Sequence, residues 1–90
     1  ELICAARDDY DAIVTKLLAM PGIGVNHPDE DGNTALMLAA ENGHKAIVAK
    51  LLAMAGIDVN RTNNTGNTAL TLAAKRENKE VAARLRTYII

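Results

Sequence analysis

The stretch Gly32–Asn60, GNTALMLAAENGHKAIVAKLLAMAGIDVN, decides the fold because most of it recurs on both sides. The upstream part of the chain contains DAIVTKLLAMPGIGVN (Asp11–Asn26), and the downstream part contains GNTALTLAAKRENKEVAARL (Gly66–Leu85). The segments align without a gap when the sequence is shifted by 34 residues. A fixed period in this range indicates a stack of similar supersecondary units, of which about three are needed for stability.

Each unit contains two short amphipathic helices. Thr34 is a good N-cap, and the apolar spacing after it predicts a first helix over Ala35–Asn42 that Gly43 ends. The same reasoning predicts a second helix over about Lys45–Met54, ended by Gly56.

A polar connection follows the second helix. Ile57 and Val59 flank Asp58 in a brief alternating stretch, after which Asn60 is suited to bond to nearby backbone amides. The next residues, RTNNTGN, place Gly66 at a tight turn. Each unit is therefore predicted to be a pair of helices followed by a protruding turn.

Two antiparallel helices and a protruding turn, repeated, resemble the ankyrin repeat. The motifs are G-x-T-x-L-x-L-A-A-x-x-G-H in Gly32–His44, and I-V-x-x-L-L and G-x-D-V-N in Ile47–Asn60. The resemblance covers essentially the whole chain. It implies an all-α solenoid of helix-turn-helix units with short protruding β-turn or hairpin loops. One departure is that Thr-Ala-Leu-Met (Thr34–Met37) stands for the family's Thr-Pro-Leu-His, so the imidazole that normally bonds back to the Thr is absent.

The repeat boundaries predict a single domain over residues 1–90. Residues 1–34 are interpreted as an N-terminal capping repeat, 35–68 as a full internal repeat, and 69–90 as a C-terminal capping repeat. The last unit is more polar than the middle one, since Arg86 replaces Leu52. Its apolar end, Tyr88–Ile90, is expected to tuck against the last helix or to mark a truncation, with a partner contact as the less favoured alternative.

Composition excludes several classes of function. The chain has 90 residues, a net charge of −1 and no long apolar run, so neither nucleic acid nor a membrane is expected as a partner. A single cysteine, Cys4, cannot form an internal disulfide, which favours a reducing, cytoplasmic location. Cys4 aligns with Leu38 and Leu72, so we expect it to be a mostly buried apolar residue.

No arrangement of residues predicts catalysis, a cofactor or a specific metal site. His27, Asp29, Glu30 and Asp31 form a polar turn that would hold a cation only weakly. The ankyrin resemblance implies a structural role for His44. For Asn26 and Asn60 it leaves two interpretations, which are stabilisation of the turn and modification by an asparagine hydroxylase.

The resemblance implies that the chain binds another protein through a concave face formed by loop tips and first helices. The chain is expected to be a monomer. "PDED" in the first loop predicts a partner with a basic patch, and Met37 is expected to supply an apolar contact at the centre. By position, the predicted binding residues are Arg7, Asp8, Glu30, Asp31, Asn33, Met37, Glu41, Asn42, Asn64, Thr65, Asn67, Thr71, Lys75 and Arg76.

Charge is distributed unevenly along the stack. Residues 1–34 hold seven acidic and two basic side chains (−5), residues 35–68 two and three (+1), and residues 69–90 two and five (+3). The gradient is consistent either with solvated caps of opposite sign or with oriented contacts to a partner or a second molecule. Alternative functions are a structural spacer or regulatory segment of a larger multidomain protein, including a bacterial or protist effector, and an engineered ankyrin scaffold.

Overall fold

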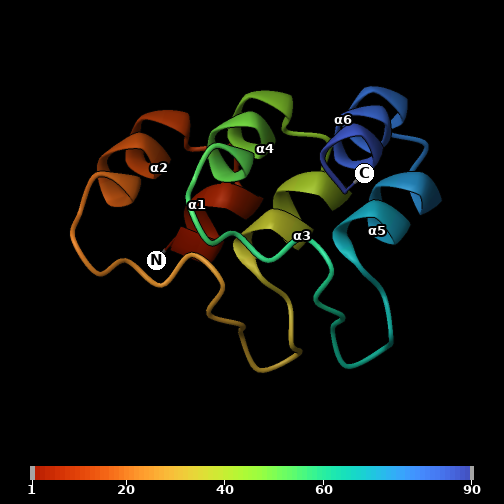
Figure 1. Ribbon diagram of the computed structural model, residues 1–90, viewed down its shortest axis with the longest axis horizontal. Coiled ribbons are helices and arrows are strands. Elements are labelled where there is room, and N and C mark those ends of the chain that lie inside the picture. Colours follow the sequence, from red (N-terminus) through yellow and green to blue (C-terminus); the bar gives the residue numbers. More distant parts are fainter. Residues whose placement is uncertain (1, 90) are drawn as a thin grey trace.

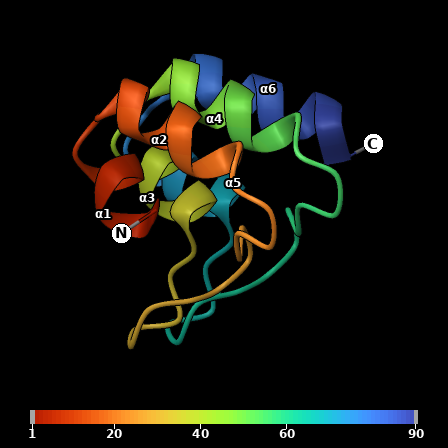
Figure 2. The same cartoon turned by 90° about the vertical axis from the view of Figure 1, so that its left-hand side faces the viewer.

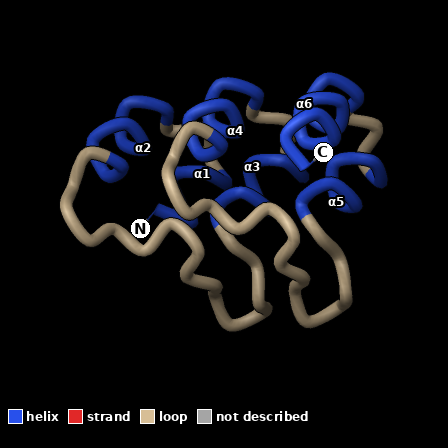
Figure 3. Tube along the Cα trace, viewed as in Figure 1, coloured by secondary structure: helices blue, strands red, loops and turns tan. Residues whose placement is uncertain are grey.

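The computed structural model describes residues 2–89, which form a stack of paired helices. The helices are α1 (Leu2–Arg7), α2 (Asp11–Leu18), α3 (Ala35–Glu41), α4 (Lys45–Leu52), α5 (Ala69–Lys75) and α6 (Lys79–Ile89). Helices α1, α3 and α5 form an inner layer, and α2, α4 and α6 form an outer layer (Figure 1). Between 2 and 89 no strand is present, so the protruding connections are loops without β-pairing (Figure 3). No helix within that range is long and apolar enough to cross a membrane.

The inner helices begin as the sequence predicts. The Thr34 hydroxyl accepts a hydrogen bond from the amide of Met37 at 3.3 Å and caps α3. The Thr34 amide in turn lies 3.5 Å from the Met37 sulfur, which therefore takes the place of the expected imidazole. At the start of α5, Thr68 makes the same cap to the amide of Thr71 at 3.2 Å.

The helices end slightly earlier than the sequence predicts. Helix α3 stops one residue short of the predicted end, with Asn42 as its C-cap, and Gly43 follows in a left-handed conformation (φ 73°). Helix α4 ends at Leu52, two residues before the predicted Met54. Gly56 (φ 80°) therefore does not end α4 directly but lies in the turn that follows it.

The core lies between the two layers and between successive repeats. Every residue of α3 from Ala35 to Ala40 is buried, because α3 lies between α1 and α5. Small alanine side chains allow these three helices to approach closely, while branched residues fill the space beneath the outer layer. The largest fully buried side chains are Leu36, Met37, Ile47, Leu51, Leu85, Val14, Val48 and Val81.

Side-chain amides and imidazoles join each repeat to the one before it. The Asn26 side chain accepts from the amide of Asp58 and donates to the carbonyl oxygen of Gly56, both at 2.8 Å. A ring nitrogen of His44 lies 2.8 Å from the carbonyl oxygen of Arg7, which confirms a structural role for this histidine. Asn78, at the equivalent position of the third repeat, donates to the last carbonyl groups of α3.

Asn26→Ala is expected to lower the free energy of unfolding by about 1–2 kcal/mol, because two good hydrogen bonds between repeats are lost. Asn60→Ala is the matched control, since the Asn60 side chain has no hydrogen-bond partner among residues 2–89. It should change stability by less than about 0.5 kcal/mol. Urea unfolding followed by circular dichroism measures both values, and equal effects would contradict the assigned role of Asn26.

Candidate protein-binding surface

Two loops project from the same side of the stack, below the inner helices (Figures 1 and 2). In the first loop, the Asp29 carboxylate accepts hydrogen bonds from the amides of Asp31 and Asn33, both at 2.9 Å. In the second, the Asn63 side-chain oxygen accepts from the amides of Thr65 and Asn67, both at 3.0 Å. Each loop is therefore closed by the same side chain-to-backbone turn.

The second loop is also bonded to the first. Asn64 donates from its amide to the carbonyl oxygen of Asp31 at 3.0 Å, and from its side chain to that of Glu30 at 3.1 Å. Asn63 adds a side-chain hydrogen bond to Asn33 at 2.8 Å. These bonds fix the backbone of the first tip. The carboxylates of Glu30 and Asp31 are exposed, and neither forms an ion pair with another residue in the 2–89 range.

A second polar region lies at the C-terminal ends of the inner helices. The Arg7 guanidinium donates to Asp8 at 3.1 Å, and this hydrogen bonding lowers the pKa of the Asp8 carboxyl. Arg76 of the third repeat lies 3.4 Å from the Glu41 carboxylate of the second. Both pairs are solvent-exposed and contribute little to stability. Within each pair the positive and the negative charge cancel. The loop tip, where Glu30 and Asp31 form no ion pair with another described residue, is therefore the more distinctly charged region.

Comparisons with known proteins agree with this architecture. The sequence profile of the family described as ankyrin repeats (3 copies) matches residues 2–88.

The chain belongs to the ankyrin-repeat family.

Ankyrin repeats are protein-interaction modules. One similar solved structure is the predatory endopeptidase Bd0816 from Bdellovibrio bacteriovorus in complex with immunity protein Bd3460. The match to a chain of that complex has a TM-score of 0.90 and 36% sequence identity, and it covers 97% of this chain. It covers 45% of the matched chain, so the ankyrin repeats described here span less than half of that chain's length. No curated protein sequence gives a significant match.

The structure divides the predicted binding residues into two groups. Glu30, Asp31, Asn64 and Thr65 are exposed at the loop tips. Arg7, Asp8, Glu41, Asn42, Lys75 and Arg76 lie at the opposite ends of the inner helices. A seven-residue helix such as α3 separates the two groups by about 10 Å, at a rise of about 1.5 Å per residue. The groups therefore form two patches rather than one continuous surface.

Four of the predicted binding residues are buried or partly buried and help to hold the loops or the caps of the inner helices. The expectation for Met37 is wrong, because its side chain is 1% exposed. The Met37 sulfur lies beside the Thr34 amide, in the place of the expected imidazole. The Met37 side chain therefore lies inside the repeat stack. The other three, Asn33, Asn67 and Thr71, are partly buried and take part in the hydrogen bonds that hold the loops and the α5 cap.

The expected burial of Cys4 is also wrong. Its counterparts Leu38 and Leu72 are buried, and each has a preceding ankyrin repeat beside it, whereas Cys4 in the first repeat is exposed. His27 is exposed, and over residues 2–89 no group of three or more His, Cys, Asp and Glu side chains is placed to hold a metal. Tyr88 is exposed in the last turn of α6, and the Ile89 side chain and Ile90 lie outside the described residues.

Proposed function

We propose that this ankyrin domain binds a partner protein with a basic patch, through the acidic tip of its first loop, and does so without catalysing a reaction. The observation that carries the proposal is the combination of a fixed backbone with free charges. Three hydrogen bonds from Asn63 and Asn64 hold the tip, while the Glu30 and Asp31 carboxylates remain exposed. A preorganised site of this kind loses little conformational entropy on binding.

The distribution of charge supports a basic partner. Residues 1–34 have a net charge of −5, and the first loop belongs to this part of the stack. Such a field speeds the encounter with a basic surface and disfavours an acidic one. The similar chain from the endopeptidase–immunity protein complex supports a folded protein, rather than a small molecule, as the class of partner.

Glu30→Lys combined with Asp31→Lys is expected to abolish capture of the partner and leave the fold unchanged. The test is affinity capture from a lysate of the source cells, with captured proteins identified by mass spectrometry. Capture by the wild-type chain should weaken as salt is raised, because the Debye length falls from about 10 Å at 0.1 M to about 3 Å at 1 M.

The matched control is Glu77→Lys combined with Glu80→Lys, which makes the same change in net charge. Glu80 lies in the first turn of α6 and Glu77 in the turn just before this helix. Glu80 forms an exposed ion pair with Lys45, so its loss should cost little stability. The control should capture the same protein as the wild type. Equal capture by all three chains would contradict the loop-tip proposal and favour the spacer function. Loss of helicity in the first variant would show that the tip is structural.

A further inference from the structure

Helices α4 and α6 of the outer layer lie side by side, with an open groove of about 850 Å³ between them. Its floor is low because the residues that line it are small, namely Ala49 and Ala53 on the side of α4 and Ala83 on α6. Leu52 and Tyr88 extend this apolar lining toward the C-terminal end of α6. Since Ala53, Ala83 and Tyr88 are exposed, the groove presents apolar surface to solvent.

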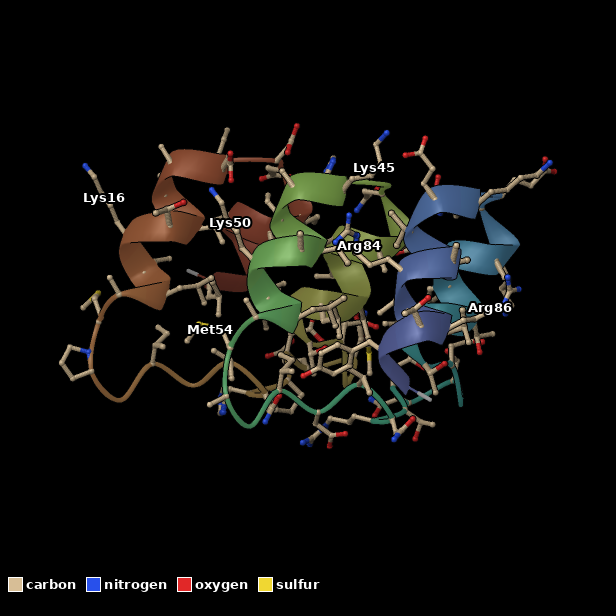
Figure 4. All side chains as sticks on the ribbon, turned by 45° about the horizontal axis from the view of Figure 1, so that its top comes forward. Lys16, Lys45, Lys50, Met54, Arg84 and Arg86 are labelled. Carbon is tan, nitrogen blue, oxygen red and sulfur yellow. The ribbon has the colours of Figure 1, made fainter. Side chains whose placement is uncertain are left out.

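The equivalent place between α2 and α4 is occupied by an ion pair. Lys50 points from α4 toward α2, where its ammonium group pairs with the Asp11 carboxylate and donates to the Thr15 hydroxyl (Figure 4). Both partners lie on α2, one helical turn apart. The first pair of outer helices therefore neutralises its own basic side chain at this position.

Between α4 and α6 the same three positions of the repeat hold different side chains. Arg84 replaces Lys50, but Lys45 and Ala49 stand where the first pair of outer helices has its acid and its hydroxyl. Lys45 is itself paired with Glu80 at 2.9 Å. Arg84 reaches toward α4 (Figure 4), and it forms no ion pair within the described part of the chain. A guanidinium group is thus left without an acidic partner beside an apolar floor.

We propose that this groove, the α4–α6 groove, binds an acidic segment of a partner protein. A carboxylate of the segment bonds to the Arg84 guanidinium, whose paired N–H groups match carboxylate geometry. A neighbouring apolar side chain of the segment covers the alanine floor. The net charge of +3 over residues 69–90 favours an acidic occupant over a basic one.

The shape of the groove favours a polypeptide over a small molecule. A pocket for a small molecule encloses most of its ligand, whereas the α4–α6 groove is lined by two helices and stays open to solvent. From Lys45 to Ala53 it is about 12 Å long, at a rise of about 1.5 Å per residue. Four residues of extended chain span about 13 Å, so a short segment of a partner fills this length.

The α4–α6 groove differs from the acidic tip of the first loop in charge and in position. The groove lies in the outer layer, and the loop projects from the opposite side of the stack, below the inner helices (Figure 1). The proposal therefore does not rest on the proposed binding at the loop tip. Occupation of one surface leaves the other accessible.

The test is an NMR titration of the isotope-labelled 90-residue chain with a blocked tetrapeptide of two glutamates flanked by leucines. We expect saturable shifts of the backbone amide signals of Ala49, Ala53 and Ala83 and of the Arg84 side-chain N–H. A tetrapeptide with lysines in place of the glutamates should not shift these signals. A tetrapeptide with serines in place of the leucines should bind more weakly, because it cannot cover the apolar floor.

Arg84→Glu should weaken binding of the glutamate peptide by about fivefold or more, because an attraction becomes a repulsion. The matched control is Arg86→Glu, which makes the same change in net charge on a side chain that points outward from the stack (Figure 4). Its affinity should stay within about twofold of the wild type. Both positions are exposed, so neither variant should unfold the chain.

Unshifted groove signals with the glutamate peptide, or equal shifts with the lysine peptide, would overturn the proposal. Equal weakening by the two arginine variants would do the same. Tighter binding of octanoate at the same signals would assign the groove to a small apolar carboxylate instead. Shifts of these signals on concentrating the chain without peptide would assign it to the acidic loop of a second copy. None of these results bears on capture at the loop tip.

Discussion

Leu51→Ala is expected to lower the free energy of unfolding by about 2–5 kcal/mol, the range for removing a large side chain from a packed core. Leu51 is fully buried in α4 and belongs to the hydrophobic core of the stack. Truncation removes its apolar burial and leaves a cavity that the short surrounding helices can close only in part. Urea unfolding monitored by far-UV circular dichroism gives the value directly.

Leu17→Ala is the matched control for this prediction. It makes the same chemical change at the same position of an outer helix, so the change in helix propensity is the same. Leu17 is only partly buried, because no repeat precedes it among residues 2–89. We expect its truncation to cost less than half as much as that of Leu51. A loss below about 1 kcal/mol for Leu51→Ala would be incompatible with the helix placement.

Gly32→Ala should cause a second large loss, of about 2–5 kcal/mol. Gly32 has a φ of 80°, a conformation that costs other residues about 1–2 kcal/mol. A Cβ atom there would also lie 2.7 Å from the side-chain oxygen of Asn64 and 2.9 Å from its amide nitrogen. Relieving this overlap must move the hydrogen-bonded second loop, which adds about 1–3 kcal/mol.

Gly66→Ala separates the conformational cost of the positive φ from the cost of the overlap with Asn64. Gly66 occupies the same place in the second loop with a φ of 81°, but no atom lies within 4 Å of a Cβ built there. Its replacement should cost only the conformational part, about 1–2 kcal/mol. The difference between the two glycine variants, measured by thermal unfolding, isolates the contact between loops. Equal losses would mean that the first loop can move away from Asn64 without cost.

Much of the fold follows from signals within one repeat. The Thr34 hydroxyl, the apolar spacing after it and the glycine at 43 together predict α3 to within one residue, because caps and helical periodicity are local properties. The 34-residue period then predicts how the units stack. The loop tips were also identified correctly as exposed, since Glu30 and Asp31 occupy a polar turn.

The errors arise where a neighbouring repeat determines the environment. Cys4 was compared with Leu38, the residue at the equivalent position of the second repeat. Burial at that position depends on a preceding repeat, and aligning residue types between repeats does not show whether one is present. Met37 was placed on the binding surface by its position in the first helix of the second repeat. Its sulfur instead lies beside the Thr34 amide, inside the stack. The sequence pattern within one repeat therefore predicts where the helices form better than it predicts which side chains are exposed.

The stacking of each repeat on its sequence neighbours has a consequence for how the chain acquires its structure. The main contacts of α3 are with α1, α4 and α5, so its native partners lie in its own repeat or in an adjoining one. Folding can begin at helix α3 of the second repeat, where Ala35–Ala40 are buried, and extend outward. Fraying would proceed in the reverse direction, from the two ends toward α3.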